Sequence, residues 1–276
     1  MLSNVQKIII SLFIFFTVPF FASAQISPPG LGLANSASWF AVGVRQELDT
    51  LKAWQSVTYF GIGRKSKPDN SNPFDKPAIL VLNQEFYHQF HHRWQYSFAL
   101  SYRRQDEYEK LSPYEHESPA IRQELRAYGR LSLITKFSRF KWVNTYRQEF
   151  RSFYNPDFTS FDEAWQLRSR FRTQLTCTLD KRKIHRFITG AEVLFSTSYH
   201  NSTSNWNALA YKESRFTFYY SYSPKTVSAI FNIGYMNNLV GAEDMYIAHY
   251  LAIDVIIENP WSLKNRSKSK IVENLE

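Results

Sequence analysis

The chain has 276 residues, of which 33 are Lys or Arg and 24 are Asp or Glu, so its formal net charge is +9. Aromatic residues make up 17% of it although its mean hydropathy is only −0.39, which is typical of strands with one apolar face. The single cysteine, Cys177, excludes an internal disulfide, so an exported domain needs another source of stability, and a closed barrel without free sheet edges provides one.

The N-terminus has the three parts of a secretory signal peptide. Lys7 precedes an apolar run over residues 8–21, and Ala-Ser-Ala at 22–24 forms a small-residue cleavage site. The run is shorter than the ~20 residues of a membrane-spanning helix, which argues against an uncleaved anchor. We therefore expect removal of residues 1–24. The remaining 252 of the 276 residues hold no second long apolar run, which excludes a helical membrane protein.

Apolar and polar residues alternate along eleven later segments, and this period of two predicts β-strands. In W-Q-L-R-S-R-F-R-T-Q-L-T-C-T-L at 165–179, one face is largely apolar and the other carries three arginines. This segment is longer than an ordinary globular strand, whereas a tilted membrane-spanning strand with its ends reaches such a length. In chain order the predicted strands are 38–48, 52–63, 78–90, 94–103, 120–132, 141–154, 165–179, 186–199, 208–222, 227–236 and 246–258.

The connections alternate between short turns and long polar loops such as 65–77 and 106–119, as in an up-and-down meander. Single-chain bacterial barrels normally have an even number of strands, so the odd count predicts either a further strand in 25–35 or a wrongly divided segment. The predicted fold is an all-β, antiparallel up-and-down transmembrane β-barrel of about 12 strands (roughly 10–12), with long loops on one rim and short turns on the other. A soluble exported sandwich, with shorter strands, is the alternative.

This fold divides the chain into a signal peptide over 1–24, an outer-membrane barrel over 25–261 and a basic polar tail over 262–276. A net charge of +9 is compatible with nucleic-acid binding, but an exported protein rarely encounters nucleic acid. The arginines here also occupy alternate positions along strands and do not form a continuous basic run. We therefore expect no nucleic acid among the partners.

Three consecutive predicted strands carry arginines on the face opposite their apolar side chains. In a closed barrel this face lines the lumen, so the arginines are predicted to form one arc of it, which we call the arginine ladder. The ladder consists of Arg122, Arg126, Arg130, Arg147, Arg151, Arg168, Arg170 and Arg172, and the acidic residues expected to face the same lumen are Glu85, Glu124, Glu149, Glu192 and Glu213.

Several interpretations of the ladder remain open. In one, arginines and glutamates pair and fill a narrow lumen, which gives a structural or assembly barrel that does not conduct. In another, the lumen is a narrow pore that prefers anions, because rings of arginine select negative solutes. Eight arginines face two glutamates on these three strands, so local pairing does not neutralise the arc. In a third, the loops 65–77 and 106–119 bind a partner.

An outer-membrane enzyme that modifies lipids is a less favoured alternative, because it needs a serine–histidine pair near the membrane surface. His88, His91 and His92 cluster at a turn, with Ser97 and Ser101 on the next strand, but their spacing specifies no triad. No cysteine or carboxylate pattern completes a metal site with these histidines. We expect no enzymatic activity, no cofactor and no metal site.

Four motifs carry a resemblance to a known family. They are S-W-F at 38–40, R-Q-E-L-R at 122–126, Y-R-Q-E-F-R at 146–151 and L-R-S-R-F-R at 167–172. Together they resemble DUF2490, a family of bacterial outer-membrane β-barrels with no established reaction, so no catalytic residues transfer to this chain. The resemblance implies the outer-membrane bilayer and the barrel-insertion machinery as partners. The arginine ladder adds small anionic solutes as candidate partners, and we expect a monomer. One departure is the tail that follows Trp261, since such barrels commonly end on an aromatic residue.

Overall fold

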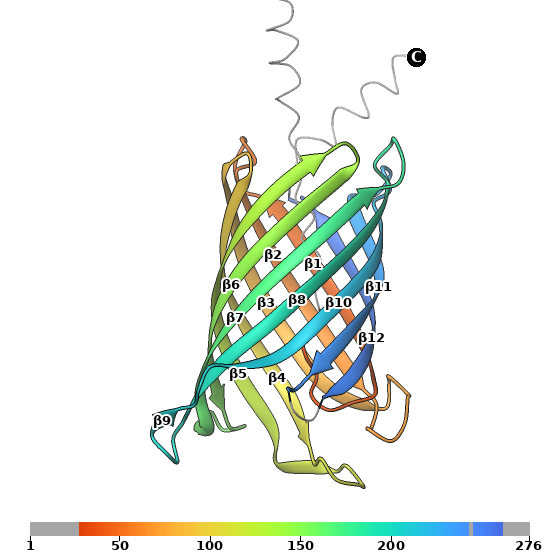
Figure 1. The fold of residues 1–276 in the computed structure, drawn as a ribbon. Helices are drawn as coiled ribbons and strands as arrows, with labels where there is room; N and C mark the ends of the chain where they lie inside the picture. The colour runs from red at the N-terminus through yellow and green to blue at the C-terminus, as the bar shows by residue number, and fades with distance from the viewer. Residues whose placement is uncertain (1–27, 243–244, 262–276) are drawn as a thin grey trace, which may run out of the picture.

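The computed structural model describes residues 28–242 and 245–261 (Figure 1). The predicted signal peptide and the basic tail lie outside these residues. Within them no helix is long and apolar enough to cross a membrane. The strands are β1 (Ser36–Glu47), β2 (Trp54–Lys65), β3 (Lys76–His91), β4 (Trp94–Tyr108), β5 (His116–Phe137), β6 (Phe140–Tyr154), β7 (Ser160–Thr178), β8 (His185–His200), β9 (Asn205–Trp206), β10 (Ala210–Tyr222), β11 (Ala229–Val240) and β12 (Tyr246–Glu258).

Eleven long strands form one closed ring, in which successive strands pair in antiparallel fashion. The two-residue β9 pairs with the end of β8, and β8 also pairs with β10. The ring closes through a parallel pairing of β1 with β12, from Ser36↔His249 to Arg45↔Glu258. The predicted all-β barrel is confirmed, and this single parallel pair accommodates the odd number of long strands.

Each of the eleven predicted segments corresponds to one long strand, so none was wrongly divided. The further strand considered for 25–35 is absent from the described part of that range, residues 28–35. Because β1 and β12 run in the same direction, β1 starts at the rim with the long connections and β12 ends at the rim with the short turns (Figure 1). We call these the long-loop rim and the short-turn rim.

Three strands exceed their predicted length by about four residues or more. β4, β5 and β7 extend toward the long-loop rim, and the β4–β5 hairpin projects beyond the ring, so half of the expected loop 106–119 is strand (Figure 1). Pro119 lies in this projection, where β5 is an edge, because its pairing with β6 begins only at Gln123↔Tyr154. A residue without an N–H is tolerated at such an edge, although the same residue suggests a loop in the sequence.

Exposed apolar side chains alternate with buried, largely polar ones along the strands. In β4, for example, Phe98 and Leu100 are exposed whereas Ser97 and Ser101 are buried. Every long strand contributes to this apolar outer face, through Val42, Phe60, Leu82, Phe98, Leu125, Phe150, Phe171, Phe187, Phe218, Ile233 and Leu251. The period of two in the sequence thus becomes an apolar exterior and a polar interior.

The lumen has one apolar side. Trp39, Tyr219, Met236 and Tyr250 are buried there in a cluster with the small alanines of the β1–β12 seam. Gly61 makes room for this cluster, because a Cβ on Gly61 would overlap the Trp39 indole. This packing gives the parallel seam an apolar inner surface, while the opposite wall of the barrel carries the charges.

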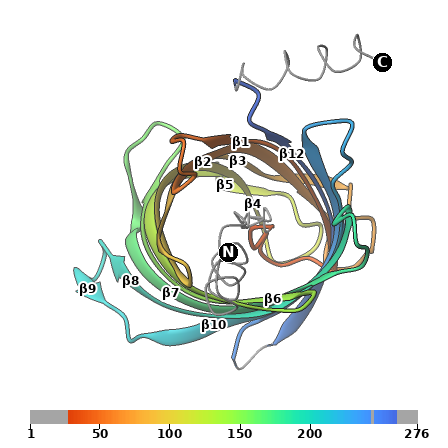
Figure 2. The same ribbon diagram turned by 90° about the horizontal axis from the view of Figure 1, so that it is seen from above.

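Residues 28–35 lie inside the ring against this apolar side (Figure 2). The Leu31 side chain is buried in the cluster, and the Leu31 N–H donates to the Tyr250 hydroxyl at 3.0 Å. Lys65 donates to the Leu31 carbonyl at 3.0 Å, and Arg215 donates to the Pro28 carbonyl at 3.2 Å. This inner segment, residues 28–35, therefore occupies the half of the lumen nearer the long-loop rim.

Candidate functional site: the charged lumen

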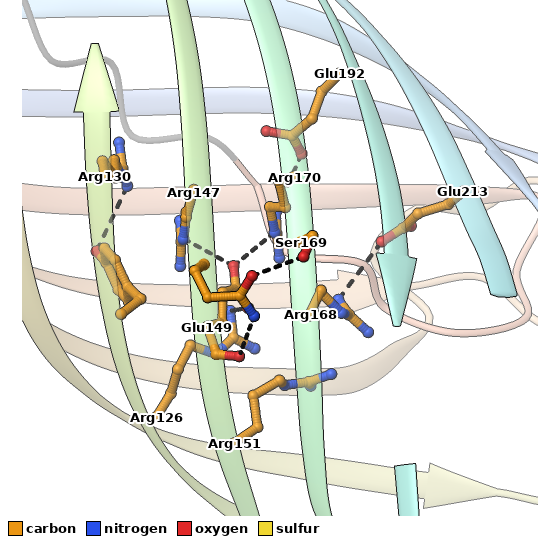
Figure 3. A network of polar contacts seen from close by, with 12 residues as sticks. Arg126, Arg130, Arg147, Glu149, Arg151, Arg168, Ser169, Arg170, Glu192 and Glu213 are labelled. Atoms are coloured by element: carbon orange, nitrogen blue, oxygen red, sulfur yellow. Dashed lines mark hydrogen bonds and ion pairs between the residues drawn. The ribbon is translucent and has the colours of Figure 1, made fainter. Parts of the chain in front are cut away.

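All eight arginines of the ladder lie on β5, β6 and β7, which are neighbours in the barrel wall. The strand register places Arg130, Arg147 and Arg170 side by side, and it also places Arg126 opposite Arg151. Like charges in such positions repel one another. The arrangement therefore requires carboxylates between the arginines, and these come from several strands (Figure 3).

Glu149 is the centre of the network. Its carboxylate is 0% exposed and contacts three guanidiniums, with Arg126 at 3.0 Å, Arg147 at 2.7 Å and Arg170 at 2.6 Å (Figure 3). A buried charge is tolerated only when it is paired and hydrogen-bonded, and three arginines satisfy this condition. Glu149 thus joins β5, β6 and β7 on the inside of the wall.

Glu124 holds a second group of arginines closer to the long-loop rim. Its carboxylate contacts Arg126 at 2.6 Å and Arg151 at 2.6 Å. Arg151 also donates to the Gln166 side chain, whose amide nitrogen donates to Glu163 at 2.9 Å. The group therefore extends as a chain of hydrogen bonds from β5 to β7.

The network continues to β8 and β10 through two further glutamates. Glu192 contacts Arg170 at 3.1 Å and Arg215 at 3.6 Å. Glu213 contacts Arg215 at 2.7 Å and Arg168 at 3.7 Å. Arg215 thus bridges the two carboxylates. It lies outside the predicted ladder, because β10 carries no second arginine that would form a repeat.

The remaining predicted residues lie at the two ends of this network. Glu85 accepts from Ser97 at 2.6 Å and from Tyr128 at 2.8 Å, and it lies 3.2 Å from Arg130. Arg122 is apart from the others, nearer the long-loop rim, where it contacts Glu107 at 2.8 Å and Glu163 at 3.6 Å. Arg172 is paired in register with Glu192 across β7 and β8.

A cavity of about 120 Å³ lies inside the barrel between the inner segment and the short-turn rim, and we call it the chamber. Its cationic lining residues are Arg103, Arg130, Lys141, Arg147, Arg170, Arg172 and Arg215, and its acidic lining residues are Glu85 and Glu192. Neutral polar side chains, among them Gln55, Gln95 and Gln174, complete the wall toward the short-turn rim. Pro28 and Pro29 of the inner segment line it as well.

Arg103 differs from the other arginines of the chamber. Its side chain is buried, with 9% exposure, and its Nε has no hydrogen-bond partner. None of the ion pairs of residues 28–242 and 245–261 includes it. The polar face of β4 contains serines and glutamines around this single arginine, so no repeated arginine pattern marks it in the sequence.

The predicted histidine cluster lies on β3 and at the β3–β4 turn. His88 lies on the outer face, where its ring stacks on Trp54 with 4.3 Å between the centroids. His200 contacts Asp162 at 3.2 Å near the long-loop rim, but no serine hydroxyl is hydrogen-bonded to a histidine among these residues. No group of three or more metal-ligating residues occurs within them either.

A family model described as "Protein of unknown function (DUF2490)" matches residues 39–244. The chain belongs to the DUF2490 family. The match begins at Trp39 in β1 and includes β2 to β11, so the whole arginine ladder and its glutamate partners lie within the DUF2490 region. No curated protein matches the chain.

Proposed function

We propose that this DUF2490 barrel is an outer-membrane protein. Its outer face carries exposed Phe, Leu, Val and Ile side chains on all eleven long strands, which in water would be an apolar surface of unusual extent. The closed ring leaves no unpaired strand edge, as a lipid environment requires. The signal peptide expected at residues 1–24 supports export, and the outer membrane is where such barrels are found.

We further propose that the lumen is an anion-preferring path. The observation that carries this proposal is the lining of the chamber, where seven cationic side chains meet two carboxylates. Fixed positive charges in a narrow, low-dielectric lumen attract anions and repel cations. The neutral polar wall toward the short-turn rim allows a hydrated anion to approach the charged part.

The path is narrow because the inner segment and the Glu124 and Glu149 groups fill the half of the lumen nearer the long-loop rim. Conduction therefore requires the inner segment to move, whereas the ion pairs of the wall stay in place.

The same packing favours a second candidate, a structural barrel with a closed lumen. The contacts of Glu149 with three arginines support this second candidate. Breaking a buried ion pair of this kind is costly, so the group holds β5, β6 and β7 in one arrangement.

Planar-bilayer recordings separate the two candidates. The protein is produced with its own signal peptide, purified in detergent from the membrane fraction and inserted into a bilayer with a KCl gradient. The pore predicts discrete openings whose reversal potential shows chloride preference, and this preference falls when Arg103 and Arg172 are replaced by Gln. Cation preference would falsify the anion path, and a folded barrel that never conducts supports the structural candidate.

A further inference from the structure

We propose that the chamber is a binding site for a small oxyanion with two or more negative charges, held by Arg103 and the arginines around it. The proposal deepens the proposed function and rests on its anion preference, because it names the chemistry of the anion. It depends on three features of the described residues: an unpartnered buried guanidinium, an excess of positive charge and the shape of the arginine fork.

Arg103 is the first feature. A buried guanidinium without a partner costs free energy, because water is removed from it and nothing replaces the lost hydrogen bonds. Arg103 is nevertheless directed into the chamber, where it has no ion pair and its Nε has no acceptor. Glu124 lies opposite Arg103 in the β4–β5 register, but none of the ion pairs of the described residues joins the two. A bound anion supplies the acceptor that the Arg103 Nε lacks.

The charge of the surrounding network is the second feature. Nine guanidiniums lie in or directly beside the chamber, namely Arg103, Arg126, Arg130, Arg147, Arg151, Arg168, Arg170, Arg172 and Arg215. Five carboxylates accompany them, namely Glu85, Glu124, Glu149, Glu192 and Glu213. The arginines outnumber the carboxylates by four, and Lys141 of the lining adds to this excess. The excess favours a multivalent anion over a monovalent one, since each added negative charge interacts with the same fixed field.

The third feature is geometric. A guanidinium presents its N–H donors in a planar fork that matches two oxygens of a phosphate or a carboxylate, and a spherical halide does not fill it in the same way. Tyr59 and Tyr87 add hydroxyl groups to the lining, and Gln55, Gln95 and Gln174 add amides. A cavity of about 120 Å³ suits an anion of a few heavy atoms with some water, and it excludes an oligosaccharide.

The direction of access also follows from the lining. Gln55, Gln95 and Lys141 each lie within two residues of the start of a strand at the short-turn rim. The inner segment closes the opposite side. The anion therefore enters from the short-turn rim, which faces the periplasm in the proposed membrane orientation.

The test measures binding without a membrane potential. The purified full-length product in detergent is titrated calorimetrically with inorganic phosphate in a chloride-free buffer, and succinate is titrated in parallel to distinguish phosphate from carboxylate sources. We expect saturable binding of at least one of the two. The variant Arg103→Gln is expected to weaken it by about tenfold to a hundredfold, the range for loss of a charge-assisted hydrogen bond.

Arg104→Gln is the matched control, because Arg104 is the next residue on β4 and points to the outer side, where its guanidinium lies 3.9 Å from Asp106. This variant should bind like the unmodified protein. Arg103→Gln breaks no ion pair of the described residues, so it should unfold at the same or a higher denaturant concentration. Equal binding by both variants, or no saturable binding of either anion by the unmodified protein, overturns the proposal.

The oxyanion-binding site and the anion-conducting path can be refuted independently of each other. Saturable phosphate binding that depends on Arg103, in a barrel that never conducts, supports the site and overturns the path. Anion-selective current without saturable binding of either probe supports the path and overturns the site.

Discussion

At the scale of single residues, Glu149 is where the barrel interior is most sensitive to change. Replacing Glu149 by Gln keeps its size but leaves Arg126, Arg147 and Arg170 without their shared carboxylate. Removing one partner of a buried ion pair destabilises a protein by about 3–5 kcal/mol, and we expect a loss in this range. Urea titration of the barrel in detergent, followed by tryptophan fluorescence, measures it.

Glu109→Gln serves as the control, because Glu109 is exposed between β4 and β5 and belongs to none of the described ion pairs. It should change the free energy of unfolding by less than about 0.5 kcal/mol. Equal stability of the two variants would show that Glu149 does not hold the three strands together.

The inward position of the ladder is visible in the sequence, but its partners are not. Alternation along one strand determines on which face a side chain lies, and this was enough to place Arg147, Arg151 and Arg170 together with Glu149. It does not reveal which side chains meet across the lumen. Arg103 and Arg215 are each the single arginine on the inward face of their strand, so only the closed ring brings them to the chamber.

At the scale of strands, the close approach of β1 and β2 depends on Gly61. A methyl group there would overlap the Trp39 indole, which is fixed in the apolar cluster of the seam. We expect Gly61→Ala to destabilise the barrel by about 1–3 kcal/mol, the usual cost of overpacking. The same urea titration tests this, with Gly129→Ala as control, since the nearest atom to a Cβ at Gly129 is 3.6 Å away. If Gly61→Ala leaves the free energy of unfolding unchanged, Trp39 is able to move and make room for the methyl group.

The inner segment offers a second test at this scale. Tyr250→Phe removes the hydroxyl that accepts from the Leu31 N–H, so we expect hydrogen exchange of the Leu31 amide to accelerate by about fivefold or more, as the loss of a ~1 kcal/mol hydrogen bond implies. Tyr235→Phe is the matched control, because Tyr235 contacts His249 on the outer face. Unchanged exchange in Tyr250→Phe would show that other contacts hold the segment.

The segments that form strands were predictable because each carries its own period-two pattern, whereas the closure of the ring was not. The pattern of β1 is satisfied equally by a parallel or an antiparallel neighbour, so the pairing with β12 depends on the whole ring. Residues 28–35 have no pattern at all. Their place in the lumen comes from Leu31 and from donors and acceptors on β2, β10 and β12, which are distant in sequence.

At the scale of the whole molecule, the proposed membrane orientation makes the two rims chemically distinguishable in cells. Long loops of outer-membrane barrels face outward and short turns face the periplasm. Ser202 lies in the connection after β8 at the long-loop rim, and Ser138 lies in the turn between β5 and β6 at the short-turn rim. Both are exposed, so each can be replaced by Cys in a Cys177→Ser background and treated with a membrane-impermeant maleimide.

We expect Ser202→Cys to be labelled in intact cells, and Ser138→Cys to be labelled only after the outer membrane is permeabilised. The same orientation places the entrance of the chamber in the periplasm, because Gln95 and Lys141 lie near the rim of Ser138. Labelling in the reverse order would show that the barrel has the opposite orientation and that the chamber opens to the outside. Equal labelling of both sites in intact cells would contradict insertion in the outer membrane.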